Sequence, residues 1–126
     1  MDMLGIKKKT FYSDCWREWT RPMVDYKVPY AYALGNHDDE ADLSRPEICE
    51  LDMTSEYSVT QCNPNVTGIT NYYLPIYSRN MSNSVPPALV WILDTNDDYC
   101  EDLVDSWGCI EKDQIGWYAN ESKKLT

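Results

Sequence analysis

The apolar positions of the 126-residue chain fall into short groups that are separated by polar, turn-rich stretches. Residues 27–34 (KVPYAYAL) and residues 88–93 (ALVWIL) are mostly apolar runs, which is typical of buried strands. Residues 70–78 (TNYYLPIYS) predict a third strand. Pro75 within it indicates an edge or a bulge, because proline cannot donate a hydrogen bond to a neighbouring strand.

Apolar residues at helical spacing first occur after residue 15. The first predicted helix has one apolar face, made of Trp16, Trp19 and Met23. Ser13 or Asp14 can cap its start, and we expect Pro22 to weaken or end it. Residues 1–11 lack the periodicity of an independent element, so none is expected there.

Two more helices are predicted further along the chain. Ser44 and Glu47 have the spacing of a capping box, which predicts a helix over residues 45–53. A last helix is predicted over residues 112–124. Its expected apolar stripe consists of Ile115, Tyr118 and Ala119. Strands that alternate with helices predict an α/β layered architecture.

Composition and charge exclude some classes of protein. The chain is 43% hydrophobic, enough for a core, which fits one globular domain or a part of a larger one. Eleven basic residues against 21 acidic ones give a net charge of −10, which disfavours binding to nucleic acids and anionic membranes. No apolar run is long enough to cross a bilayer, so no membrane span is expected.

The five cysteines form no C-x-x-C pair, so zinc-ribbon and thioredoxin-like sites have little support. Cys100 and Cys109 enclose a short acidic loop and could form a disulfide. The odd count leaves one cysteine free or paired with other sequence. Buried reduced thiols are the alternative interpretation.

Three glycosylation sequons also occur, at Asn65, Asn80 and Asn120. Together with the cysteines they favour a secretory or lysosome-like (vacuolar) compartment, with the cytoplasm as the alternative.

The only histidine of the chain, His37, stands in the sequence GNHDDE, residues 35–40, directly after the first predicted strand. An isolated histidine in a polar loop usually has no catalytic role, but ligands of open α/β sheets bind where strands end. Asn36 offers a hard oxygen ligand for a metal ion. His37 can donate a proton or a hydrogen bond to a phosphoryl oxygen, and Asp38 can hold its ring in one tautomer.

GNHDDE after a buried strand resembles the asparagine-histidine motif of the calcineurin-like metallophosphoesterases. Its six-residue form is similar to the branch related to small purple acid phosphatases. TNYYLPI, WILDTND and WGCIEKDQIGWY resemble later segments of that branch, and they follow in family order. The resemblance therefore extends from residue 28 to residue 118.

This resemblance implies a function for the loop. Asn36 would ligate one metal of a two-metal site, holding divalent or trivalent Fe, Mn or Zn. His37 would face the phosphate of a phosphoester substrate and act in catalysis, with Asp38 orienting its ring. A metal-activated water would attack the ester.

The chain also departs from the family pattern. The upstream aspartate-x-histidine and glycine-aspartate motifs are missing, and with one histidine the downstream histidine ligands are missing too. In LDTND, Asn96 replaces a glycine, although asparagine also tolerates left-handed backbone angles. We therefore expect residues 1–126 to be the central part of one phosphoesterase domain, an incomplete layered sandwich that is inactive alone. The alternatives are a catalytically inactive interaction module of this family and an acidic secreted binding domain.

Other polar and aromatic residues have structural interpretations. Asp39 and Glu40 are expected to be either outer groups of the site or solvated carboxylates, and Asp94 to cap a turn rather than bind metal. Asn71 and Tyr72 are expected to pack beneath the site, and Trp107 and Trp117 to be core anchors. A second acidic group is expected to be solvated: Asp97, Asp98, Glu101, Asp102 and Asp105.

Overall fold

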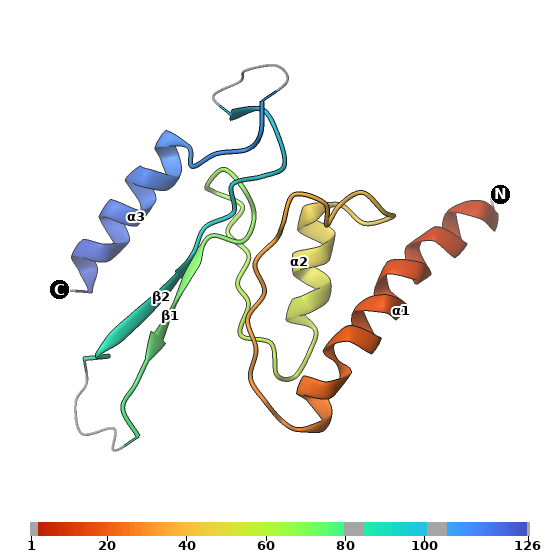
Figure 1. Cartoon of the computed structure of the whole chain (residues 1–126), viewed down its shortest axis with the longest axis horizontal. Coiled ribbons are helices and arrows are strands. Elements are labelled where there is room, and N and C mark those ends of the chain that lie inside the picture. The colour runs from red at the N-terminus through yellow and green to blue at the C-terminus, as the bar shows by residue number, and fades with distance from the viewer. Residues whose placement is uncertain (1–2, 80–84, 101–105, 126) are drawn as a thin grey trace.

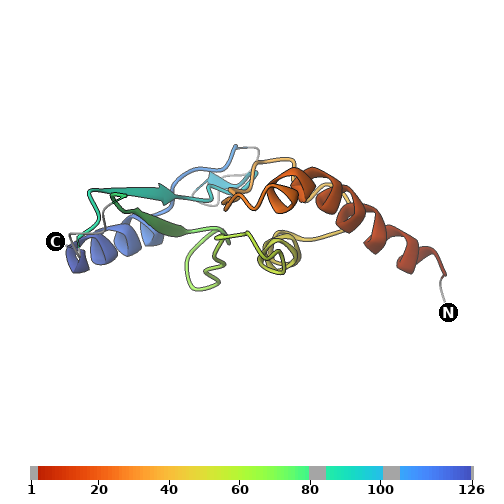
Figure 2. The same ribbon diagram turned by 90° about the horizontal axis from the view of Figure 1, so that it is seen from below.

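The computed structural model describes residues 3–79, 85–100 and 106–125. The elements are α1 (Met3–Asp25), α2 (Arg45–Met53), β1 (Tyr72–Ile76), β2 (Ala88–Ile92) and α3 (Lys112–Lys124). Helices α1 and α2 lie at one end of a flat, elongated molecule, and the β1–β2 hairpin and α3 lie at the other (Figures 1 and 2). The expectation of an α/β chain is confirmed. The described residues form one two-stranded antiparallel sheet, which is compatible with part of a layered sandwich.

Helix α1 is longer at both ends than predicted. It begins at Met3, so the expectation of no element before residue 12 is wrong. Once a helix has a packed turn, its extension through good helix formers such as the Lys7–Lys9 run costs little. Pro22 lies inside the helix and does not end it. Its missing N–H removes one hydrogen bond only, close to the end of the helix.

The true end of α1 is set by Lys27, which has a left-handed backbone with φ of 55°. Its N–H donates to the Val24 carbonyl at 3.1 Å, and the Val28 N–H donates to the Met23 carbonyl at 2.8 Å. These two bonds form a Schellman motif, which satisfies carbonyls at the end of a helix.

The segment predicted as the first buried strand is not a strand in the structure. Tyr30 forms one isolated bridge with Ser58, and the backbone N–H groups that follow it at Tyr32 and Leu34 bond to side chains. The N–H of Tyr32 donates to Thr60 Oγ1 at 2.9 Å, and that of Leu34 donates to Thr70 Oγ1 at 3.3 Å. Threonine hydroxyls therefore take the place of the carbonyls of a neighbouring strand, while Leu34 is buried as expected.

Helix α2 has the predicted bounds and the predicted capping box. The backbone N–H and the hydroxyl of Ser44 both donate to the Glu47 carboxylate, at 3.0 and 2.9 Å. The Trp16 indole N–H of α1 donates to Asp52 Oδ1 of α2 at 3.1 Å. The main hydrophobic core includes this tryptophan and consists of three buried side chains: Trp16, Leu34 and Ile48.

Strands β1 and β2 pair in antiparallel register from Tyr72 opposite Ile92 to Ile76 opposite Ala88. Because the sheet has two strands, both are edges, which confirms the interpretation of Pro75. The expectation that β2 is buried is wrong, since Val90 is 48% exposed. A second layer on this face would be needed to bury it, and the described residues do not supply one.

Helix α3 also has the predicted bounds, but its packed face matches the predicted apolar stripe only in part. The Trp117 and Tyr118 rings make edge contacts with Trp91 of β2, at centroid distances of 5.6 and 4.7 Å. Gln114 is fully buried, whereas Ile115 is 56% exposed. The predicted apolar stripe is therefore wrong at Ile115. A buried amide, not an isoleucine, is the centre of the packed face.

Two disulfides connect the chain. The predicted pair Cys100–Cys109 is confirmed, and Cys49–Cys62 forms a second pair that the sequence analysis did not predict. The interpretation of buried reduced thiols is thus wrong, and Cys15 is an exposed free thiol. Within the described residues, no helix has the length and apolarity required for a membrane span.

Candidate active site

The candidate loop, residues 35–40, precedes the N-terminal end of α2 (Figure 1). The Gly35 N–H donates to Asp38 Oδ2 at 2.5 Å, which closes the loop into a turn. Asn36 and His37 are exposed, and Asp38 is half-buried. The loop therefore presents an amide and an imidazole to solvent on a turn that Asp38 holds from within.

His37 is oriented by Glu40, not by Asp38 as the resemblance implied. Its Nδ1 lies 2.6 Å from Glu40 Oε1. Since a carboxylate accepts, Nδ1 carries the proton and Nε2 is the nitrogen that can face a ligand. The hydrogen bond and charge of Glu40, helped by Asp38, raise the pKa of His37 above its usual 6.5.

Asp38 lies close to Tyr12 of α1. Burial and the nearby Asp38 carboxylate raise the pKa of the Tyr12 hydroxyl to about 12, and they raise the pKa of Tyr32 beyond its usual range. A cavity of about 380 Å³ lies here, lined by Tyr12, Cys15, Trp16, Trp19, Tyr32 and Asp38. Asp38 therefore lines this cavity and also accepts the hydrogen bond from Gly35 that closes the loop.

Arg45 joins the loop to a distant segment, a role that the sequence analysis missed. Its Nη1 donates to the Gly35 carbonyl at 2.9 Å and lies 3.4 Å from Asp39 Oδ1. Its Nη2 lies 2.5 Å from Asp94 Oδ1. One signal was present: a basic residue in the first turn of a helix opposes the helix dipole, which indicates a partner elsewhere.

The interpretation of Asp94 as a turn-capping carboxylate is confirmed. Its side chain accepts from the N–H groups of Ile69, Thr70 and Asn96 at 2.8, 3.2 and 3.0 Å. Burial opposes ionisation, but these bonds and the Arg45 charge hold the pKa of Asp94 below its usual value. Asn96 adopts the left-handed backbone expected of it, with φ of 59°.

Gly68 lets the chain approach Asp94 closely. It has φ of 77°, and a Cβ at this position would lie 2.3 Å from the Asp94 carbonyl oxygen. Any other residue would force the two segments apart.

Asn71 and Gln114 extend this buried polar network to α3. Gln114 Nε2 donates to Asn71 Oδ1 at 2.9 Å and to the Asp94 carbonyl at 2.6 Å. The Asp94 N–H donates to Asn71 Oδ1 at 3.1 Å. The Tyr72 hydroxyl donates to the Tyr32 carbonyl at 2.6 Å. Asn71 and Tyr72 are thus buried, hydrogen-bonded side chains, which confirms a structural role for both, while their placement beneath the loop stays a prediction.

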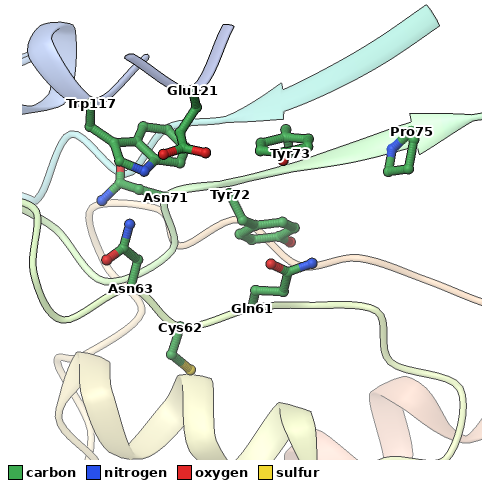
Figure 3. A pocket seen from close by; sticks show the side chains of 9 residues that line it. All are labelled: Gln61, Cys62, Asn63, Asn71, Tyr72, Tyr73, Pro75, Trp117 and Glu121. Atoms are coloured by element: carbon green, nitrogen blue, oxygen red, sulfur yellow. The ribbon is translucent and has the colours of Figure 1, made fainter. Parts of the chain in front are cut away.

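A separate pocket of about 440 Å³ lies between β1 and α3 (Figure 3). Gln61 and Asn63 face it from one side, and Trp117 and Glu121 of α3 face it from the other. It contains none of the candidate residues 36–38. The pocket and the candidate loop are therefore distinct.

Other predicted residues have mixed outcomes. Trp117 packs on Trp91, but Trp107 is 76% exposed, so its interpretation as a core anchor is wrong. Of the acidic group, Asp97 and Asp98 are half-buried, and Glu101, Asp102 and Asp105 lie outside the described residues. Asn65 and Asn120 are exposed, as glycosylation would require, and Asn80 also lies outside the described residues.

The described residues supply only some of the ligand atoms that a two-metal site needs. One group of three potential ligands occurs among them, Cys100, Cys109 and Glu111, and its cysteines form a disulfide. Asn36 presents an exposed amide oxygen, which fits a single ligand of a hard or borderline metal ion. The described residues alone therefore do not assemble a two-metal centre.

Comparison with known proteins gives several relatives. The chain is 34% identical over 80 residues to Phosphatase DCR2 of Saccharomyces cerevisiae, covering 60% of the chain and 14% of that protein. It is 33% identical over 101 residues to an uncharacterized protein of Schizosaccharomyces pombe, covering 79% of the chain and 18% of that protein. It is 28% identical over 116 residues to Probable inactive purple acid phosphatase 28 of Arabidopsis thaliana, covering 80% of the chain and 29% of that protein. No protein-family model and no solved structure gives a significant match.

Proposed function

Because the chain is related to the purple acid phosphatase-like metallophosphoesterases, we propose that it is the central part of the catalytic domain of a metal-dependent phosphoester hydrolase. The observation that carries the proposal is the loop of residues 35–40. Its amide and imidazole are exposed together, and the imidazole is held by a carboxylate. The chain spans 14% to 29% of the three relatives described, so the remaining ligands would come from sequence outside it.

Three residues of the loop have a proposed role. Asn36 would hold one of two metal ions through its amide oxygen. The metal ions, when bound, supply Lewis acidity and an activated water. His37 would present Nε2 to a phosphoryl or leaving-group oxygen and donate a proton to it. Glu40 supports this role, since its carboxylate raises the pKa of His37 and keeps the ring protonated to higher pH.

A catalytically inactive member of the family is the second candidate. The observation that favours it is the printed name of three relatives, each a "probable inactive" purple acid phosphatase. An inactive domain would keep the fold of the loop without the chemistry.

The experiment that separates the two candidates is hydrolysis of p-nitrophenyl phosphate by the intact protein that carries this chain. It is purified with Fe, Mn or Zn present, and its metal content is measured alongside. The first candidate predicts turnover that a chelator abolishes and metal restores. Absence of turnover from a folded, metal-loaded protein would favour the inactive module.

A further inference from the structure

Arg45 attaches to the candidate loop at both ends. Its guanidinium contacts the Gly35 carbonyl at 2.9 Å and the Asp39 carboxylate at 3.4 Å. The candidate residues 36–38 lie between these two points. The segment that carries the proposed chemistry is therefore bracketed by one side chain, which comes from the first turn of α2.

The other side of the guanidinium is anchored in the protein interior. Its Nη2 pairs with Asp94, whose side chain is fully buried, and the Arg45 side chain is 9% exposed. Asp94 is itself held by the backbone N–H groups of Ile69 and Asn96. The loop is thus tied to a buried, hydrogen-bonded carboxylate and not to a mobile surface group.

We propose that Arg45 is a positioning residue of the site, which fixes the backbone of the loop so that Asn36 and His37 face the metal and the phosphate together. The inference rests on the proposed function. Both terminal nitrogens of Arg45 contact protein acceptors and only 9% of its side chain is exposed, so we assign it a role through the loop and not by direct contact with the phosphate. Such control matters because a displacement of about 1 Å at a reacting group can cost about a hundredfold in rate.

Lysine cannot replace arginine in this role. A guanidinium is a planar fork that reaches two acceptors in fixed directions, whereas an ammonium is a single point of charge. Arg45→Lys keeps the positive charge beside Asp94 but cannot also hold the Gly35 carbonyl. It therefore separates loop positioning from charge compensation.

The test compares Arg45→Lys with the matched control Arg21→Lys in the intact protein. Arg21 is exposed on α1 and pairs with Glu18 at the surface. Four quantities are measured. They are kcat and KM for p-nitrophenyl phosphate and the ¹⁵N order parameters of residues 36–38, all well below the melting temperature, and the melting temperature itself by far-UV circular dichroism. We expect Arg45→Lys to lower kcat by about tenfold to a hundredfold with KM nearly unchanged, and to lower the order parameters of the loop. Arg21→Lys should change neither.

The outcomes are distinguishable. If Arg45→Lys lowers the melting temperature but leaves both kcat and the loop order parameters unchanged, Arg45 is merely structural and the inference is wrong. If the wild-type protein has no phosphatase activity, the proposed function fails. The order parameters then decide alone: a fall at residues 36–38 supports positioning by Arg45, and unchanged values overturn it.

Discussion

Arg45 Nη2 and Asp94 Oδ1 lie 2.5 Å apart although the two residues are 49 positions apart in the sequence, and both side chains are buried. The pair joins the start of α2 to the end of β2. Removing one partner leaves a charge in the interior without its counter-ion, which usually costs about 3–5 kcal/mol. We therefore predict that Arg45→Met lowers the free energy of unfolding by about that amount, measured by urea denaturation of the intact protein.

A double-mutant cycle checks that the pair itself is responsible. Arg45→Met combined with Asp94→Asn removes both charges, so the double variant should lose less stability than the two single variants added together. Arg21→Met, which breaks an exposed pair with Glu18, should cost less than about 1 kcal/mol. Strict additivity of the Arg45 and Asp94 variants would contradict the structure.

The lowered pKa of Asp94 predicts a pH dependence of stability. The folded-state pKa lies below the unfolded value, so the stability that Asp94 contributes is present above the unfolded pKa and is lost as pH falls through the folded one. The difference in unfolding free energy between wild type and Asp94→Asn should be largest near neutral pH and shrink below about pH 4. A difference that grows on acidification would mean that Asp94 is not ionised in the folded protein.

The cysteine pairing predicts a thiol count. Cys49–Cys62 and Cys100–Cys109 are disulfides, which leaves Cys15 as one reactive thiol among five cysteines in the chain. Labelling residues 1–126 under non-reducing conditions and mapping the labelled peptides should therefore find Cys15 alone. Labelling at Cys49 would show that the second disulfide is absent.

The Cys49–Cys62 disulfide should also stabilise the fold. It closes a loop with a sequence separation of 13 residues, for which the chain-entropy relation gives about 3 kcal/mol. Replacing both residues by alanine should lower the unfolding free energy by that order. Cys15→Ser is the matched control and should have little effect.

The contact between Glu40 and His37 predicts how the pH profile of catalysis depends on Glu40. If His37 acts as the acid, activity falls as pH rises through its pKa, and Glu40 raises that pKa. Glu40→Gln should therefore move the basic limb of the kcat profile to lower pH. Asp39→Asn, at a neighbouring carboxylate that faces Arg45, is the control and should leave the limb in place. An unmoved limb in Glu40→Gln would exclude Glu40 as the partner of the catalytic imidazole.

The elements that could be predicted from the sequence are those with local signals. The capping box of Ser44 and Glu47 and the turn residues around β1 need no knowledge of distant partners, so α2 and the two strands could be predicted, whereas the pairing of the strands could not. The run before Gly35 shows why other elements were not. An apolar run indicates burial, but whether it becomes a strand depends on its neighbour, and here the hydroxyls of Thr60 and Thr70 take that place.

The same distinction applies to the site. GNHDDE could be found because its residues are contiguous, although the local choice between Asp38 and Glu40 as the partner of His37 required coordinates. Arg45 and Asp94 are 49 residues apart, and no pattern in one sequence pairs them. The Cys49–Cys62 pair was missed for the same reason.

The proposed roles, metal binding by Asn36 and action on the phosphate by His37, are tested most directly by measuring metal content and turnover together in Asn36→Ala and His37→Ala variants of the intact protein. We expect His37→Ala to lower kcat by about a hundredfold to ten-thousandfold with metal content nearly unchanged. Asn36→Ala should lower the occupancy of one metal site together with activity. If His37→Ala removes metal as completely as Asn36→Ala, or if neither variant changes phosphatase activity, the assignment of roles is contradicted.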